Sequence, residues 1–154
     1  MKKFFFDCGT RDAVASAGLL VLRIGFGLMM AIGHGWQKVG KFEALKDEWT
    51  VPAIWPLWHM SPPVSLVATI VAELGCASLI VLGLATRPAA FVLGFAMIVA
   101  AFQVHGDGPW FLPAEGAKEP ALLYLCACVA LVVAGAGKAS VDALVYKEKK
   151  RRFF

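Results

Sequence analysis

The chain has 154 residues, of which 59% are hydrophobic and only 17% are charged. Soluble domains average about 45–50% apolar and about 25% charged residues, so the composition excludes an ordinary soluble globular domain. The length allows one compact unit. The net charge of +4 comes largely from a basic C-terminal tail at 147–152, which favours contact with anionic lipids over binding to nucleic acid.

Four apolar stretches account for the excess of hydrophobic residues: 14–33, 64–85, 88–104 and 120–136. A membrane-spanning helix needs about 20 mainly apolar residues, within a range of about 17–25. The sequence therefore predicts an all-α, integral membrane four-helix bundle that forms a single domain over residues 1–154. Residues 1–12 are expected to form a short interfacial arm, because Asp7, Arg11 and Asp12 interrupt any signal-peptide core.

Basic residues predict the orientation of the bundle. The predicted inner side carries ten Lys and Arg residues, in the arm, in the turn at 86–88 and in the tail. The outer side carries four: Lys38, Lys41, Lys46 and Lys118. The positive-inside rule then places both termini in the cytoplasm.

Two outer loops are expected, at 34–63 and at 105–118, and a short amphipathic helix is expected within 38–49. The tight turn at 86–88 makes the second and third helices antiparallel neighbours. All five Trp residues fall in the outer loops. They indicate either an interfacial lipid belt or a surface that docks a protein partner.

Two charged residues interrupt the apolar stretches, Arg23 in the first and Glu73 in the second. A charge at mid-bilayer costs roughly 2.5–3.5 kcal/mol on insertion scales, so such residues usually face the bundle interior. From the helical rise, each lies about 13 Å from the end of its helix, Glu73 below the outer end and Arg23 above the inner end. A direct pair is therefore expected, and it either only fixes helix register or contributes to a functional polar site.

A second polar group is expected at the outer ends of the helices. Its members are His34, Gln37, Lys38, Gln103, His105 and Glu119, which follow or precede three different apolar stretches. Such a cluster could hydrogen-bond a carbonyl or phenol head group or move its protons, or it could be a polar rim in contact with water and lipid. If a ligand binds there, its tail is expected to run between the helices past Gly27 and Met30.

The cysteines indicate no metal site and no redox motif. Cys126 and Cys128 point about 200° apart on a helix, so they cannot chelate one metal, and there is no C-x-x-C motif. The histidines do not form the paired ligands that a haem b would need. No nucleotide-binding or nucleophile motif occurs, so no catalytic residue is identified and no intrinsic cofactor is expected.

Several short segments, in this order, resemble the DoxX family of small bacterial and archaeal membrane proteins. They are Leu22-Arg23, Gly27, His34-Gly35-Trp36-Gln37-Lys38, Ala72-Glu73-Leu74, Gly83-Leu84-Ala85-Thr86-Arg87-Pro88, His105-Gly106, Glu119 with Ala121-Leu122-Leu123-Tyr124, and Ser140-Val141-Asp142. The resemblance implies four helices in the cytoplasmic (inner) membrane and a link to quinone or thiol redox metabolism. It also implies, as in some members, a subunit of a quinone-reducing oxidoreductase.

Three functions remain open from the sequence. The first is a quinone-associated subunit of an inner-membrane oxidoreductase, with Arg23 and Glu73 in a buried pocket. The second is a non-enzymatic anchor or assembly partner whose Trp-rich outer loops dock another protein. The third is a small transporter that forms a homo-oligomer and uses Glu73 to carry a proton.

Overall fold

The computed structural model describes residues 6–145, and nothing but helices and loops occurs in that range, which confirms the all-α expectation. Residues 1–5 of the expected arm and the basic tail at 147–152 lie outside it. The helical elements, in chain order, are α2 (Ala13–Met30), η1 (Ala31–Trp36), α3 (Gln37–Gly40), α4 (Phe42–Leu45), η2 (Leu57–His59), α5 (Pro62–Ile70), η3 (Val71–Cys76), α6 (Ala77–Leu82), α7 (Thr86–Val99), η4 (Ala100–Val104), α8 (Glu119–Ala134) and α9 (Val141–Val145).

Consecutive helical elements join end to end into long continuous helices, which we call rods. Among the described residues, three rods are long and apolar enough to cross a membrane: Ala13–Gly40, Pro62–Leu82 and Thr86–Val104. The helix α8 is also apolar but has 16 residues, which correspond to about 24 Å of helical rise. The apolar segments predicted from the sequence are all helical, with ends within two or three residues of those expected, except at one place.

The exception is the end of the first rod. This helix was expected to end at Gly33, with 34–63 in a loop, whereas it continues through η1 and α3 to Gly40. Glycine weakens a helix only by about 1 kcal/mol, and Gly35 here permits a close approach to η3. As a consequence, His34, Gln37 and Lys38 are held on a helix rather than in a loop. Within the expected amphipathic segment, α4 is helical.

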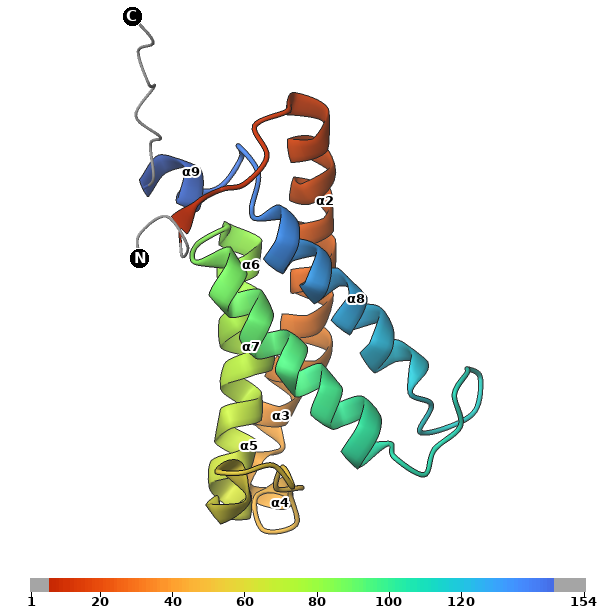
Figure 1. Cartoon of the computed structure of the whole chain (residues 1–154). Helices are drawn as coiled ribbons and strands as arrows, with labels where there is room; N and C mark the ends of the chain where they lie inside the picture. Colours follow the sequence, from red (N-terminus) through yellow and green to blue (C-terminus); the bar gives the residue numbers. More distant parts are fainter. Residues whose placement is uncertain (1–5, 146–154) are drawn as a thin grey trace, which may run out of the picture.

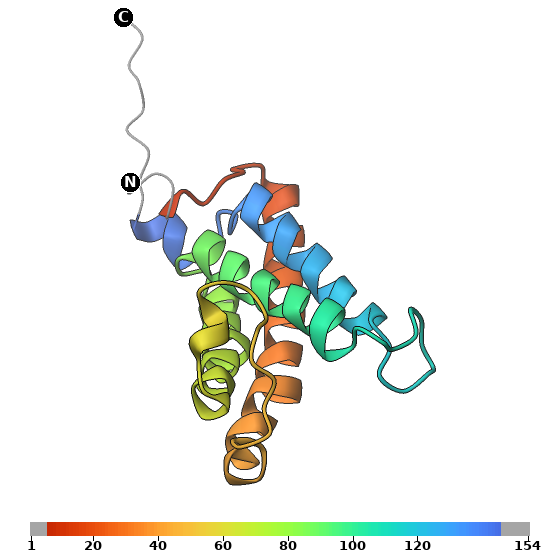
Figure 2. The same ribbon diagram turned by 60° about the horizontal axis from the view of Figure 1, so that its bottom comes forward.

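The rods pack as two inclined layers (Figures 1 and 2). The first rod packs along α6 and, farther on, η1 packs against η3, while α7 packs along α8. The α7–α8 pair is inclined to α2 and α5, so that α7 and α5 diverge toward the end of the molecule that carries the loops at 41–61 and 105–118 (Figure 1). We refer to this end as the loop end and to the opposite end as the terminal end.

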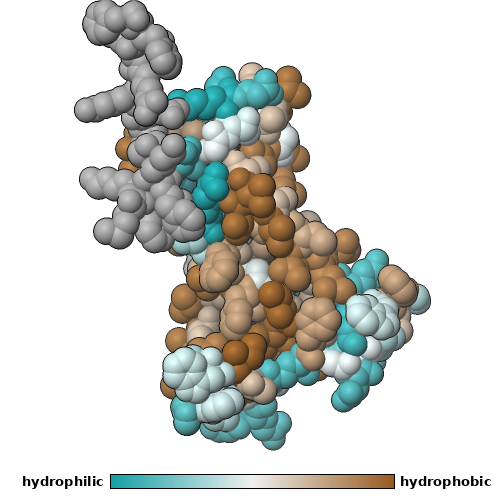
Figure 3. Space-filling model, viewed as in Figure 1, coloured by the Kyte–Doolittle hydropathy of each residue, from teal (hydrophilic) through white to brown (hydrophobic). Residues whose placement is uncertain are grey.

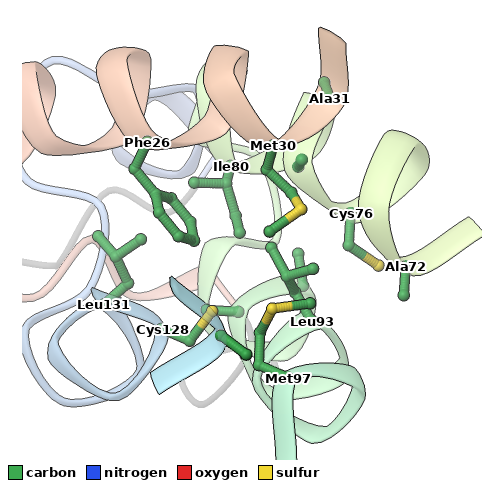
Figure 4. Packing of buried hydrophobic residues seen from close by; sticks show 14 of the residues in the cluster. Phe26, Met30, Ala31, Ala72, Cys76, Ile80, Leu93, Met97, Cys128 and Leu131 are labelled. Carbon is green, nitrogen blue, oxygen red and sulfur yellow. The ribbon is translucent and has the colours of Figure 1, made fainter. Parts of the chain in front are cut away.

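The core lies where these layers cross (Figure 4). Side chains from α2, α6, α7 and α8 meet there, and they include Met30, Ile80, Leu93 and Leu131, which are almost fully buried. Around the core, large apolar side chains point outward from each rod; examples are Val21, Ile32, Val71, Phe91, Leu123 and Val133. They form an apolar belt between two polar ends (Figure 3). Such a belt is the surface that hydrocarbon, not water, covers.

Candidate functional site

A cavity of about 810 Å³ opens between the rods at the loop end. Its walls come from η1 and α3, from α5 and η3, from α7 and η4, and from the first turns of α8, and segments of both loops also line it. Most of the wall is apolar. The polar side chains that reach it include His34, Lys38, Glu73, His105 and Tyr124. An apolar cavity of this size with a few convergent polar groups is the usual form of a small-molecule site.

Lys38 and Glu73 form the charged centre of the cavity wall. Lys38 Nζ donates a hydrogen bond to Glu73 Oε2, and their side chains are only 17% and 7% exposed. Lys38 Nζ also lies 5.7 Å from the centre of the Trp49 ring. Because the first rod continues through η1 and α3 to Gly40, Lys38 is held on a helix beside η3. The pair offers both an ammonium donor and a carboxylate acceptor to anything that occupies the cavity.

His34 and Tyr124 lie near this pair. Their ring centroids are 5.7 Å apart in an edge-on arrangement, and the Tyr124 ring also packs against Phe26, with centroids 5.2 Å apart. His105 contributes a second imidazole from the end of η4. Tyr124 was missed as a site residue. Its phenol hydroxyl lies within an otherwise apolar helix, and such a hydroxyl usually finds a polar partner. This feature could have indicated that Tyr124 faces a polar site.

π-Helical turns surround the cavity. Within residues 6–145, η1, η3 and η4 are π-helical, and they contribute His34, Glu73 and Val104 to its wall. π-Helical turns often occur at functional sites, because the extra residue in the turn redirects side chains. Their common position supports a functional role for this end of the bundle.

The η1–η3 contact depends on Gly35. A Cβ atom added there would lie 2.7 Å from the main-chain nitrogen of Leu74 and 2.9 Å from the carbonyl carbon of Glu73. Gly27 in α2 and Ala31 in η1, at intervals of four residues, extend the same buried row of small residues along the first rod. Small residues at this spacing allow close approach of helices in membranes.

We expect Gly35→Ala to lower the free energy of unfolding by about 1–3 kcal/mol, the usual cost of overpacking. The added methyl group would push η1 away from η3 beside Glu73. Gly33→Ala is the matched control, because a Cβ there meets nothing within 4 Å. Thermal unfolding in detergent would test this; equal melting temperatures for the two variants would contradict the close packing.

Gln103 has a different role from the one predicted. It anchors the first loop: its side-chain amide donates to the Val51 carbonyl (2.6 Å) and accepts from the Ala53 amide (2.8 Å). On the opposite wall, Ser65 Oγ donates to the Thr50 carbonyl (2.7 Å) and Trp49 Nε1 donates to Thr69 Oγ1 (3.2 Å). Residues 49–53 thus bridge α5 and η4 at the loop end of the cavity. We refer to this segment as the roof.

Two further predicted residues lie outside the cavity wall. Glu119 Oε2 accepts a hydrogen bond from the Leu112 amide (2.9 Å) and so closes the second loop onto the start of α8. Gln37 is exposed on the first rod. Of the predicted head-group cluster, the structure therefore brings His34, Lys38 and His105 to one cavity, beside Glu73.

Arg23 does not pair with Glu73, so the predicted direct pair is wrong. The guanidinium group of Arg23 is fully buried toward the terminal end of the bundle. There it donates to the Ile80 and Val81 carbonyls (3.3 and 3.4 Å) and to the Ala139 carbonyl. Ile80 lies seven residues beyond Glu73, about 10 Å along the helix. The depths estimated from the helix ends placed Arg23 beside Glu73, whereas its guanidinium group lies about two turns farther along the second rod.

The terminal end is closed by Asp142, which was expected only at the start of an amphipathic tail. Asp142 is 1% exposed, and its carboxylate accepts from the amides of Ala85 (2.7 Å) and Thr86 (3.0 Å). It therefore caps the N-terminus of α7, while Arg23 binds carbonyls of the last turn of α6. Each charge has the sign that stabilises its helix end. The feature that could have indicated this role is that α7 begins without a side-chain cap from its own segment, so its first amides need an acceptor from elsewhere.

The expected path of a ligand tail past Gly27 is also wrong. A Cβ added to Gly27 would lie 2.6 Å from Val81 Cγ2 and 3.0 Å from the Ala77 carbonyl oxygen, so this seam is filled. Met30 does line the cavity.

No group of three or more His, Cys, Asp or Glu side chains that could hold a metal ion is found between residues 6 and 145.

The apolar belt and the long apolar helices, with a cavity at one end, define a multi-pass membrane protein. The DoxX family model matches residues 18–106, which run from α2 into the first residues after η4. The chain belongs to the DoxX family. The matched region contains Arg23, His34, Lys38, Glu73 and His105.

Two proteins of Haemophilus influenzae, both described as uncharacterized, are similar to the chain. One is 39% identical over 88 residues, which cover 56% of this chain and 65% of that protein. The chain thus spans just under two thirds of this relative's length. The other is 28% identical over 147 residues, which cover 92% of this chain and 91% of that protein. No solved structure matches the chain.

Proposed function

We propose that the cavity binds the head group of a quinone and that the protein is a quinone-associated subunit of an oxidoreductase in the bacterial or archaeal cytoplasmic membrane. The observation that carries this proposal is the Lys38–Glu73 pair in the wall of a large apolar cavity. The electron donor would belong to a partner protein. A buried charged pair that served only folding would not need an open cavity beside it.

The cavity residues fit a quinone by their donors. A bound quinone supplies two-electron, two-proton redox chemistry. Lys38 can donate a hydrogen bond to a carbonyl oxygen of the head group, and His34 and His105 can donate or accept. Glu73 can hold a proton next to the same oxygen. Tyr124 and Phe26 provide aromatic surface beside His34.

We expect His34→Ala to weaken the binding of a tail-less quinone analogue about tenfold, the loss for one hydrogen bond of roughly 1.4 kcal/mol. The melting temperature should change little, since His34 is exposed and lines the cavity. Gln37→Ala is the matched control, three residues away on the same rod. If His34→Ala binds like the parent, or the parent binds no analogue, the head-group site is contradicted.

For the topology, we propose four spanning helices with the loop end outside and both termini in the cytoplasm. The N-terminal arm and the chain after α8 lie together, because the Gly137 amide donates to the Cys8 carbonyl (2.8 Å). This proximity supports an even number of crossings, with α8 as the fourth. The roof and both loops would then face the periplasm or the cell exterior.

Cysteine labelling tests this orientation. With a membrane-impermeant maleimide on intact cells, Trp55→Cys in the exposed first loop should be labelled and Lys138→Cys at the terminal end should be spared. The parent chain, whose native cysteines remain, gives the background signal. The reverse pattern would place the cavity on the cytoplasmic side.

One observation favours a protein partner as well. Trp55, Trp58 and Trp110 are each more than half exposed at the loop end. We propose that these rings contact lipid head groups and the partner that supplies electrons. A stable non-redox partner would favour the anchor function instead, and proton-coupled flux in liposomes would favour a transporting homo-oligomer.

A further inference from the structure

We propose that the cavity takes a long-tailed quinone from within the membrane, through a lateral groove between α5 and α7 that holds the isoprenoid tail. This inference rests on the proposed function, because it assigns the groove to the tail of the ligand whose head group lies at Lys38 and Glu73. It replaces the tail path past Gly27, which helix packing closes.

The aqueous side of the cavity is covered. Hydrogen bonds hold the roof at 49–53 on both sides, to Ser65 and Thr69 of α5 and to Gln103 of η4. The second loop is closed by main-chain hydrogen bonds from Lys118 to Pro109 (3.0 Å) and from Glu119 to Trp110 (3.1 Å). Residues 112–117 of this loop also line the cavity. A ligand from water would have to displace these segments.

The lateral side is bounded by α5 and α7. Residues of α5 that line the cavity recur at helical spacing and include Ser65, Ala68 and Thr69, while α7 contributes Val92, Phe95 and Val99. From Val92 to Val99 the wall runs for about 10 Å along the helix. The divergence of α5 and α7 toward the loop end is visible in Figure 1. The wall thus extends from the head-group level toward the middle of the belt.

Small side chains leave the groove wide, and its edges are open. Ala68, Ala72, Ala96 and Ala100 line it. Ala68 is exposed and Val92 is 45% exposed, and each lies next to an exposed apolar residue, Val67 or Phe91, so we place the two edges at the surface that lipid covers. Deeper passage is blocked by Leu93 and Met97, which are almost completely buried in the core. The groove therefore leads outward to lipid, as an apolar isoprenoid chain requires.

The test uses the purified full-length protein and two probes that share one head group: a benzoquinone with a long isoprenoid tail and the same benzoquinone without a tail. We expect Ala68→Phe to weaken binding of the tailed probe about tenfold or more, because several methylenes lose their site. Binding of the tail-less probe should stay within about twofold of the parent by the same scale. Ala130→Phe, at an exposed position of α8 away from the cavity, should leave both unchanged.

A second substitution, Val99→Trp, narrows the opposite wall and should give the same selective loss. Unchanged binding of the tailed probe in both groove variants would overturn the lateral groove, as would an equal loss of both probes. If the parent binds the tailed probe no better than the tail-less one, the tail gains nothing from the protein and the inference is overturned while the head-group site stands. If the parent binds neither probe, the proposed function itself fails and the inference fails with it.

Discussion

Replacement of Arg23 by Met is expected to lower the free energy of unfolding by about 3–5 kcal/mol, the usual cost of breaking a buried charged group's interactions. The carbonyl groups of Ile80, Val81 and Ala139 would lose the guanidinium donor, and of these Ile80 would keep the hydrogen bond from the Gly83 amide. Asp142 would remain buried without the positive charge near it. Each buried unsatisfied group costs roughly 1–3 kcal/mol, so the estimate is consistent with the contacts.

A double-mutant cycle measured by unfolding in detergent separates the partners of Arg23. With Asp142→Asn, the combined loss should be smaller than the sum, since the two charges close the same helix–turn–helix. With Glu73→Gln, the losses should add, because Glu73 pairs with Lys38 at another level. Additivity with Asp142→Asn and coupling with Glu73→Gln would restore the pairing predicted from the sequence and contradict the structure.

Replacement of Lys38 by Met is expected to have a similarly large effect, about 3–5 kcal/mol, because Glu73 would be left as an unpaired carboxylate in an apolar wall. Glu73→Leu alone should cost about as much, because Lys38 would then be the charge without a partner. The double variant Lys38→Met with Glu73→Leu should recover most of the stability, since apolar side chains replace both charges.

The exposed pair of Lys46 and Glu43 is the matched control for this cycle. Their side chains are 2.6 Å apart, but Glu43 is 82% exposed. Surface pairs contribute little, so Lys46→Met should leave the melting temperature unchanged. If Lys38→Met is equally harmless, Lys38 and Glu73 are not held as a desolvated pair.

The helices were predictable from the sequence because their signals are local. Apolar runs bounded by Pro62, Thr86-Arg87-Pro88 and Glu119-Pro120 located the helix starts to within about two residues. The first helix was predicted too short because the apolar run ends at Gly33 and polar residues follow it, although Gly35 lies within the helix. Whether a glycine ends a helix or permits close packing depends on the neighbouring helix, which the sequence does not show.

The cavity was only partly predictable. His34, Lys38 and His105 were placed together because they lie at the same depth, and depth follows from helix length. The partner of each charge was not predictable, since a shift of two turns moves Arg23 from Glu73 to the end of α6. The roles of Asp142 and Tyr124 were not predicted, because they depend on contacts between segments that are far apart in the chain.

The central claim is that the Lys38–Glu73 cavity binds a quinone, and the most direct test is the mass of the small molecules that remain bound after purification in mild detergent. The parent should retain a quinone in an amount near one per chain. The folded double variant, Lys38→Met with Glu73→Leu, should retain much less while keeping its helical content. A parent that carries no quinone, or a double variant that carries as much as the parent, would contradict the claim.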